Sequence, residues 1–261
     1  MRLLVLTGAG VSAESGIPTF RGKDGYWRNF DPAKLATPQA FARDPKLIWE
    51  WYRERRQRIR KAQPNAAHLA IARLAEHSDE FLLVTQNVDD LHTRAGLPKE
   101  KMVQIHGDIF VTRCSRCDFS KGDDQAPQDY GAGGEYPPSP WLQRTREHEH
   151  EELLPRCCEC NALMRPGVVW FGEQLPWNEL QRVENFLERG ACDFVIVVGT
   201  SATFGYIIDW ALRARASNGE LVEVNPEETS LSQFATRLVR EPAAIALPRI
   251  VDELLGERLG L

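Results

Sequence analysis

Four short apolar runs constrain the fold of this chain more than any other feature of its sequence. They are Leu3–Leu6, Phe81–Val84, Phe194–Val198 and Leu221–Val224. Unbroken apolar runs of this length are typical of strands buried on both faces, as in a parallel sheet between two layers of helices. Helical periodicity fills the intervals, namely in Ala66–Ala75, Leu180–Leu187, Tyr206–Ala214 and Pro248–Leu255. The sequence therefore predicts an α/β fold.

Small and polar residues follow every one of these runs. The four endings are Thr7-Gly8-Ala9-Gly10, Thr85-Gln86-Asn87, Gly199-Thr200-Ser201 and Asn225-Pro226. Doubly wound sheets bind their ligands at the carboxyl ends of the strands. The endings therefore predict a nucleotide-binding edge on a Rossmann-like parallel sheet.

The first ending is close to the dinucleotide-binding fingerprint. Gly8-Ala9-Gly10-Val11-Ser12-Ala13 follows a predicted strand, precedes a predicted helix and has Ala in the third glycine position. Glycines let a backbone approach a pyrophosphate, although they also suit a plain tight turn. A dehydrogenase would add an acid on a second strand about 20 residues later. Asp24 and Asp31 lie in no apolar strand, so the turn indicates a nucleotide without indicating hydride transfer.

Composition narrows the class of protein. The chain has 261 residues and a net charge of -5, which gives no sign of a general nucleic-acid binder. No stretch approaches the roughly 20 apolar residues that a membrane span requires. The apolar start at Leu3–Leu6 is too short for the core of a signal peptide. We therefore predict a cytoplasmic protein with no membrane or nucleic-acid partner. A monomer is expected, but the sequence does not fix the oligomeric state.

Two segments depart from the strand and helix pattern. Residues 28–65 read as a helical excursion, and residues 107–165 hold two pairs of cysteines. We interpret both as insertions that together form a smaller, zinc-binding and helical domain. The Rossmann-like part then comprises residues 1–27, 66–106 and 166–261 of a single catalytic unit. A cleft is expected between the two parts.

The cysteine pairs predict a metal site. Cys114 and Cys117 form one C-x2-C pair, and Cys157 and Cys160 form the other. In a reducing compartment such pairs indicate metal rather than disulfides, and four thiolates can hold one structural Zn²⁺. Cys158 leaves an ambiguity, because either it or Cys157 could pair with Cys160; the commoner C-x2-C spacing favours Cys157.

Three further segments carry groups that suit a nucleotide and its chemistry. Glu14–Gly22 is a loop with glycines near both ends, as in segments that close over ligands, and it holds Phe20 and Arg21. The residues Gln86–Asp89 offer amides and a carboxylate for ribose and carboxamide groups. His106, between an apolar residue and a glycine, is a candidate general base, although a lone histidine is more often structural.

In their order along the chain, these features resemble the sirtuins. The resemblance rests on Gly8–Ser12 with Phe20-Arg21, Gln86–Asp89, Ile105-His106-Gly107, the cysteine pairs, Val168–Glu173, Gly199–Ser201 and Val224-Asn225-Pro226. It implies a Rossmann-like, DHS-like NAD-binding domain with a small zinc domain, and NAD⁺ and an acyl-lysine peptide that enter the cleft from opposite sides.

The resemblance also implies roles for individual residues. His106 would be the base, and Asn87 would act with it by positioning nicotinamide. The NAD⁺ site would consist of Gly8, Ala9, Gly10, Ser12, Glu14, Thr19, Phe20, Arg21, Gln86, Asn87, Asp89, Gly199, Thr200, Ser201, Asn225, Pro226, Glu227 and Ala243. The peptide would pair with Val168–Gly172 by β-augmentation, and the substrate site would include Ala36, Tyr52, Arg55, Val168, Phe171, Gly172 and Glu173.

The implied reaction begins when the acyl oxygen of the modified lysine attacks the nicotinamide ribose, which releases nicotinamide and leaves an alkylamidate. His106 then accepts a proton from the ribose hydroxyls, so that the 2′-oxygen can attack. Water completes the release of lysine and 2′-O-acyl-ADP-ribose. Because a carboxamide is a poor nucleophile, close positioning in a dry tunnel must contribute much of the rate.

The predicted helix Leu47–Lys61 indicates the acyl group. Ile48, Tyr52, Arg55 and Ile59 form one stripe of this helix. If its apolar members face inward, the phenol of Tyr52 and the guanidinium of Arg55 enter the cleft. Together they could bind a carboxylate. On pattern alone, Arg55 could equally lie on a wet face with its neighbouring arginines. The Tyr-x-x-Arg spacing and Ala36 resemble class III sirtuins, which implies removal of succinyl and malonyl groups, with some deacetylation.

Other readings stay open at this point. A zinc-stabilised receptor for NAD⁺ or ADP-ribose would explain the glycine-rich turn and the cysteines, but not His106 beside an amide cluster. A mono-ADP-ribosyltransferase could use the same scaffold. A dehydrogenase fits least well, since the acid that its fingerprint requires is missing from a second strand.

Overall fold

The computed structural model describes residues 1–19, 32–122 and 154–259. Its larger sheet has six strands in the order β3-β2-β1-β7-β8-β9. All neighbouring strands are parallel. The strands are β1 (Arg2–Thr7), β2 (Glu80–Thr85), β3 (Met102–Gln104), β7 (Cys192–Val198), β8 (Arg215–Val224) and β9 (Arg237–Val239). The four predicted strands are confirmed. The three-residue edge strands β3 and β9 were not predicted, because so short a segment carries no periodicity.

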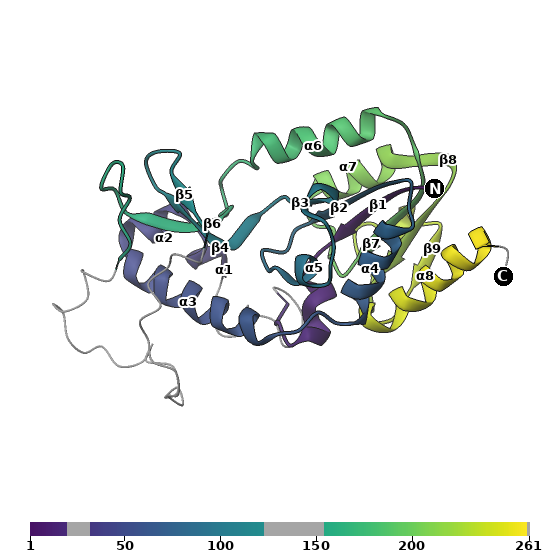
Figure 1. The fold of residues 1–261 in the computed structure, drawn as a ribbon, viewed down its shortest axis with the longest axis horizontal. Coiled ribbons are helices and arrows are strands. Elements are labelled where there is room, and N and C mark those ends of the chain that lie inside the picture. Colours follow the sequence, from purple (N-terminus) through teal and green to yellow (C-terminus); the bar gives the residue numbers. More distant parts are fainter. Residues whose placement is uncertain (20–31, 123–153, 260–261) are drawn as a thin grey trace.

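Helices cover both faces of this sheet (Figure 1). One face packs under α4 (Ala66–Glu76) and α8 (Ala243–Leu259), and the other under α6 (Trp177–Glu188) and α7 (Gly205–Ala214). β1 contributes Leu3 and Val5 to one core and Leu4 and Leu6 to the other, and all four are fully buried. This burial on both faces explains the unbroken apolar runs.

Two helical predictions need correction. The helix predicted from Pro248 begins at Ala243 and contains Pro248 within it, although proline is favoured only in the first turn of a helix. The segment after β1 is not an α-helix but a 3₁₀ helix, η1 (Ala9–Ser15), which ends at Gly16 with φ 82°. The remaining short elements of this part are α5 (Leu91–Arg94), η3 (Lys99–Lys101) and η7 (Ser232–Phe234).

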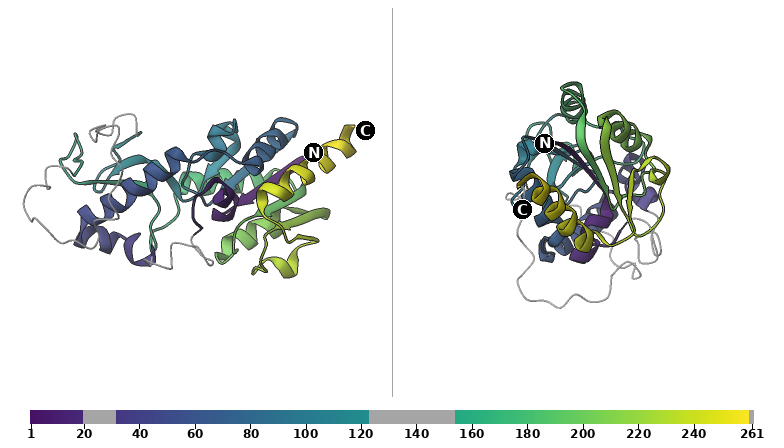
Figure 2. Two further views of the ribbon diagram at one scale, coloured as in Figure 1. Left: turned by 90° about the horizontal axis from the view of Figure 1, so that it is seen from below. Right: turned by 90° about the vertical axis from the view of Figure 1, so that its right-hand side faces the viewer.

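A second, antiparallel sheet lies at one end of the molecule (Figures 1 and 2). It comprises β5 (Ser120–Lys121), β4 (Gly107–Cys114) and β6 (Met164–Val168), and the helices α1 (Pro32–Leu35), α2 (Pro38–Arg43) and α3 (Pro45–Lys61) accompany it. β6 crosses the predicted domain boundary at residue 166, so residues on both sides of that boundary pair with β4. The division into two domains stays a prediction.

Helix α3 is tied to the second sheet by two buried side chains. The indole Nε1 of Trp49 donates to the carbonyl of Met164 at 2.9 Å. The guanidinium of Arg56 donates from Nε to the carbonyl of Ile109 at 2.6 Å and from Nη2 to that of Val111 at 3.0 Å. Arg56 is only 5% exposed, so not all arginines around Arg55 lie on a wet face. These bonds fix the rotation of α3 about its axis.

Within residues 1–19, 32–122 and 154–259, no helix is both long enough and apolar enough to cross a membrane.

Candidate active site and metal centre

A pocket of about 590 Å³ opens at the carboxyl edge of the parallel sheet and continues to α3 and β6. Within the described residues, every predicted cofactor or substrate residue except Ser12 and Asp89 lines it, as does His106. Phe20 and Arg21 lie outside the described residues. The volume falls within the range of about 300–1,000 Å³ that is usual for ligand sites. The tertiary fold thus brings together residues from 8 to 243 of the chain.

The glycines of the pocket allow two backbone turns to touch. A Cβ added to Gly10 would lie 2.6 Å from the Cα of Gly199, and one added to Gly8 would lie 2.7 Å from the Cβ of Thr200. Gly199 itself has φ +60°, and its added Cβ would lie 2.5 Å from the backbone nitrogen of Val11. Gly10 N–H donates to the Gly199 carbonyl at 2.8 Å. Glycine is therefore required here for turn packing, whatever ligand lies above.

Two side-chain amides form hydrogen bonds that join the strand endings at the carboxyl edge of the sheet. Gln86 Nε2 donates to the Thr200 hydroxyl at 2.9 Å, and Asn225 Nδ2 donates to the Thr200 carbonyl at 3.0 Å. The endings of β2, β7 and β8 are thereby joined before any ligand arrives. Such preorganisation lowers the ordering cost of binding.

Ser12 and Asp89 lie beneath the pocket rather than on its wall. Ser12 is 1% exposed; its hydroxyl donates to Asp89 Oδ2 at 3.0 Å and accepts from Asn87 Nδ2 at 3.1 Å. His68 Nε2 lies 3.3 Å from the same hydroxyl. The other ring nitrogen of His68, Nδ1, lies 3.3 Å from the backbone nitrogen of Asn65 and 3.1 Å from its Oδ1. Asn87 is thus held by its nitrogen, which leaves its oxygen as the group it can offer to a ligand.

Burial sets the charge of this network. It raises the pKa of Asp89 to about 6 and lowers the pKa of His68 to about 4. The pKa of His92, which packs on His68 at 4.8 Å between ring centroids, also falls well below its usual value, first through burial and then through His68. Neutral histidines beside one carboxyl group fit a buried network that is satisfied by hydrogen bonds.

His106 presents one ring nitrogen to the pocket region. Its Nδ1 lies 3.0 Å from the carbonyl of Gln86, which can only accept, so Nδ1 carries the proton and Nε2 carries the lone pair. Nε2 lies 2.7 Å from the hydroxyl of Tyr206. Burial lowers the pKa of His106, while the bond to Gln86 opposes that shift. A general base must be a neutral imidazole with one unprotonated ring nitrogen, and His106 has this form.

Sequence reasoning missed two aromatic members of this group. Phe204 and Tyr206 line the pocket and stack on each other, with ring centroids 5.5 Å apart and an interplanar angle of 10°. The signal available in the sequence was their place directly after Gly199-Thr200-Ser201 at the end of a strand. By its pattern alone, Tyr206 indicates only the start of the helix Tyr206–Ala214.

The predicted stripe on α3 is buried, and two of its four members line the pocket. Ile48, Tyr52, Arg55 and Ile59 are all at most 7% exposed, and Tyr52 and Arg55 line the pocket with Ala36. The guanidinium carbon of Arg55 lies 4.7 Å from the centroid of the Trp51 ring and 5.3 Å from that of Tyr52. The Tyr52 oxygen accepts from Trp170 Nε1 at 3.0 Å, so its own O–H can donate elsewhere.

Glu173 shapes the wall beside Tyr52. It pairs with Arg165 at 2.5 Å and with Arg113 at 3.3 Å, and it accepts from the backbone nitrogen of Trp170 at 2.8 Å. These bonds hold the pKa of Glu173 below its usual value despite partial burial. Arg55 and Glu173 line this end of the pocket, whereas Arg113 and Arg165 pair with Glu173 from outside the lining.

The segment Val168–Gly172 is only partly a strand. β6 ends at Val168, and the chain then turns, with φ 85° at Gly172. The backbone of Phe171 donates to the carbonyl of Ala36 at 2.9 Å, which ties this segment to the helical excursion. Phe171 is 37% exposed at the pocket mouth.

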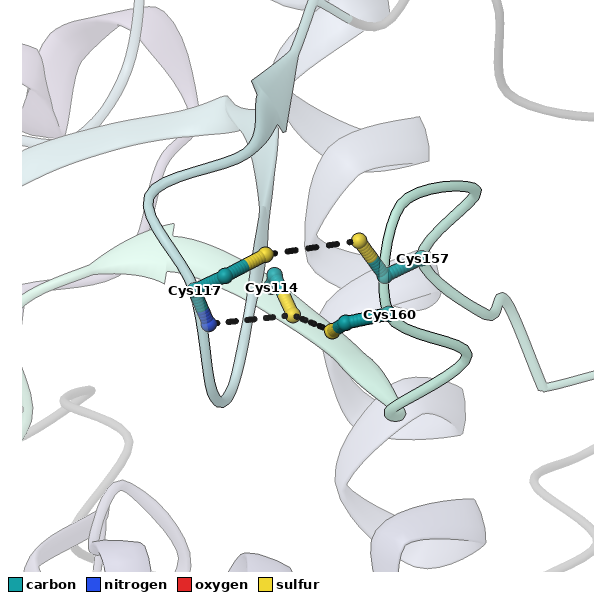
Figure 3. A group of neighbouring side chains, drawn as sticks. All are labelled: Cys114, Cys117, Cys157 and Cys160. Atoms are coloured by element: carbon teal, nitrogen blue, oxygen red, sulfur yellow. Dashed lines mark hydrogen bonds between the residues drawn. The ribbon is translucent and has the colours of Figure 1, made fainter.

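The four cysteines of the two pairs converge as predicted (Figure 3). Their sulfur atoms all lie within 4.8 Å of one another, with Cys114 to Cys160 at 3.4 Å and Cys117 to Cys157 at 3.6 Å. Four sulfurs around one Zn²⁺ at 2.3 Å would be about 3.8 Å apart, so the cluster fits a tetrahedral structural site. Cys158 is exposed and outside the cluster, which favours Cys157 as the ligand.

Loss of one thiolate should weaken both metal binding and the second sheet. We expect Cys160→Ala to lower zinc content from one equivalent per chain and to lower the thermal midpoint by several degrees, because metal binding contributes folding free energy. Plasma emission spectrometry and calorimetry measure the two effects. Cys158→Ala is the matched control and should change neither. Full zinc retention in Cys160→Ala would contradict the assignment.

Comparisons with known proteins agree on one family. The model of the Sir2 family matches residues 8–204. The NAD-dependent protein deacylase of Aquifex aeolicus is 42% identical over 97% of this chain and 95% of its own length. The mitochondrial NAD-dependent protein deacylase sirtuin-5 of Danio rerio is 42% identical over 96% of this chain and 82% of its own. A solved Sir2 homologue–NAD complex superposes with a TM-score of 0.80 at 42% identity, covering 98% of this chain and 90% of that one.

Proposed function

Because this chain belongs to the Sir2 family, it is an NAD-dependent protein deacylase, and we propose that it removes succinyl and malonyl groups from lysine side chains. Acetyl groups are removed as a secondary activity. The products are nicotinamide, free lysine and 2′-O-acyl-ADP-ribose. NAD⁺ is a cosubstrate, and one structural Zn²⁺ is held by Cys114, Cys117, Cys157 and Cys160.

The shape and chemistry of the carboxyl edge support the place of NAD⁺. The touching turns at Gly10 and Gly199 leave backbone close to the pocket floor, where a pyrophosphate can approach. Asn225 and Ala243 line the part of the pocket assigned to the adenosine half. Asn87, held by Ser12, offers its amide oxygen to the carboxamide of nicotinamide. Ser12 and Asp89 act through Asn87 and do not touch the cofactor.

The single observation that carries the acyl preference is the position of Arg55. Arg55 is 7% exposed and lines the pocket, and its guanidinium lies beside a phenol. Burial raises the pKa of Tyr52, which keeps that phenol protonated and able to donate. A carboxylate at the end of an acyl chain satisfies both groups, since charge-assisted bonds to Arg are strong and can be bidentate. A neutral acetyl group carries no charge for the guanidinium to bind.

The catalytic step depends on His106. Its lone pair on Nε2 accepts a proton that originates on a ribose hydroxyl, and the carbonyl of Gln86 stabilises the resulting imidazolium through Nδ1–H. The peptide enters along Val168–Gly172, where its backbone pairs with the protein. Phe171 at the mouth and Trp170 inside exclude water from the acyl channel.

Four peptides that differ only in the acyl group test this proposal. We expect kcat/KM for succinyl- and malonyl-lysine to exceed that for acetyl-lysine by about tenfold or more, which corresponds to about 1.4 kcal/mol. Nicotinamide release and product mass are the readouts. Equal or better turnover of acetyl-lysine would refute the preference. Binding of NAD⁺ without nicotinamide release would indicate a receptor, and ADP-ribosylated protein would indicate a transferase.

Two further properties belong to the same proposal. We propose that the enzyme is cytoplasmic and monomeric. Light scattering of the purified chain tests the second of these, with a mass near 29.6 kDa as the expected result.

A further inference from the structure

The catalytic nitrogen of His106 already has a partner. Because Nδ1–H donates to Gln86, the hydroxyl of Tyr206 must be the donor in the 2.7 Å bond to Nε2. An imidazole nitrogen has one lone pair, which lies in the ring plane. A ribose hydroxyl therefore cannot bond directly to Nε2 while Tyr206 occupies it.

Tyr206 is held in place by its surroundings. It lies in the first turn of α7 and stacks on Phe204, and its ring centroid is 4.9 Å from that of Trp210. Trp210 is 2% exposed, and its Nε1 donates to Glu184 at 3.2 Å. To leave Nε2, the phenol would have to break the stacking with Phe204 and the packing against Trp210. Displacement by substrate is therefore the less favourable route.

We propose that Tyr206 relays a proton from the ribose hydroxyl of NAD⁺ to His106, an inference that rests on the proposed function. A phenol oxygen can accept one hydrogen bond while its own proton is donated, and Tyr206 lines the pocket where that hydroxyl lies. The ribose O–H bond breaks as its proton moves to the Tyr206 oxygen. The Tyr206 proton moves to Nε2 of His106, and the ribose oxygen keeps the electron pair with which it attacks the acyl carbon.

Charges balance in this relay. Tyr206 is neutral before and after the transfer, and His106 becomes an imidazolium. Burial raises the pKa of Tyr206, which disfavours a free phenolate and makes the two transfers occur together. The relay acts only after nicotinamide has left, because the earlier bond formation to the ribose carbon needs no proton transfer to His106.

Tyr206→Phe tests the relay, since it removes the hydroxyl and keeps the ring. We expect peptide deacylation to fall about tenfold or more, within the range of general acid–base effects. Exchange of labelled nicotinamide into NAD⁺, which reports the first half of the reaction, should stay within about twofold. A proton inventory of deacylation in mixed H₂O and D₂O should curve for wild type, with two protons in flight, and be linear for the variant.

A measurement without cofactor tests the hydrogen bond itself. The ¹⁵N resonance of His106 Nε2 should shift in Tyr206→Phe, while Nδ1 should keep its protonated position. ADP-ribose affinity, measured by calorimetry, should be unchanged. Ser78→Ala is the control, because it also removes a buried hydroxyl, bonded to the carbonyl of Leu74 at 2.5 Å, outside the pocket. It should change neither exchange nor deacylation.

Three outcomes would overturn the relay. They are deacylation in Tyr206→Phe equal to or faster than wild type, an equal loss of exchange and deacylation, or an unshifted Nε2 resonance. A wild-type enzyme that releases no nicotinamide would instead refute the proposed function, and the ¹⁵N measurement would still decide whether Tyr206 bonds to His106.

Discussion

Replacing His106 by Tyr should abolish deacylation, with a fall in kcat of about a thousandfold or more. Among the described side chains of the pocket, only His106 has an unprotonated ring nitrogen whose tautomer is fixed, because its Nδ1–H donates to the carbonyl of Gln86. A tyrosine at this position is protonated at neutral pH and cannot accept the ribose proton. Single-turnover assays with a succinyl-lysine peptide measure the effect.

The fold should survive this change, because His106 is only half buried and both sheets have cores that exclude it. Thermal unfolding and ADP-ribose binding check this point. His77→Gln is the matched control, since His77 is an exposed histidine that bonds to the carbonyl of Arg73 far from the pocket. If His106→Tyr forms product at the wild-type rate, His106 is not the base.

Replacing Arg55 by Met should reduce kcat/KM for succinyl-lysine by roughly a hundredfold or more. Methionine conserves the apolar stem but leaves the carboxylate of the substrate buried without its cation, which costs about 3 kcal/mol or more. Deacetylation should change by less than about threefold, because an acetyl group makes no charged bond. The measured quantity is the ratio of the two kcat/KM values.

Arg58→Met provides the control for this second result. Arg58 lies on the same helix but is 43% exposed, and it pairs with Glu54 at the surface. Its replacement should leave both activities as they are, since exposed pairs of this kind contribute little. Desuccinylation that is intact in Arg55→Met would remove the basis for the acyl preference, although NAD-dependent deacylation could stand.

Much of the fold followed from local patterns. We could predict the four long strands, the helices after them and the cysteine pairs from sequence. Each leaves a local pattern, namely an unbroken apolar run, helical periodicity or a fixed spacing of thiols. The edge strands β3 and β9 were missed, since three residues carry no such pattern. The helix through Pro248 was placed too late for a related reason: the tertiary packing of α8 outweighed the local preference of proline for the first turn.

The pocket shows the same division. Its backbone part at Gly8, Gly10 and the strand endings was predictable, because a parallel sheet gathers the carboxyl ends of its strands at one edge. Individual side chains were less so. Ser12 and Asp89 were predicted as cofactor residues; neither lines the pocket, and Ser12 bonds to both Asp89 and Asn87. The sequence shows that both side chains are polar, but it does not show that both are buried.

The sequence by itself determined the layers of the fold, the cysteine cluster apart from the choice between Cys157 and Cys158, and the histidine that we propose as the base. Only the tertiary structure decided that Arg55 faces the pocket and that Arg56 binds the carbonyls of β4. It alone revealed that Tyr206, 100 residues from His106 along the chain, bonds to its Nε2. The physical reason is that periodicity reports which face of an element is buried, whereas the partner that buries it comes from distant parts of the chain.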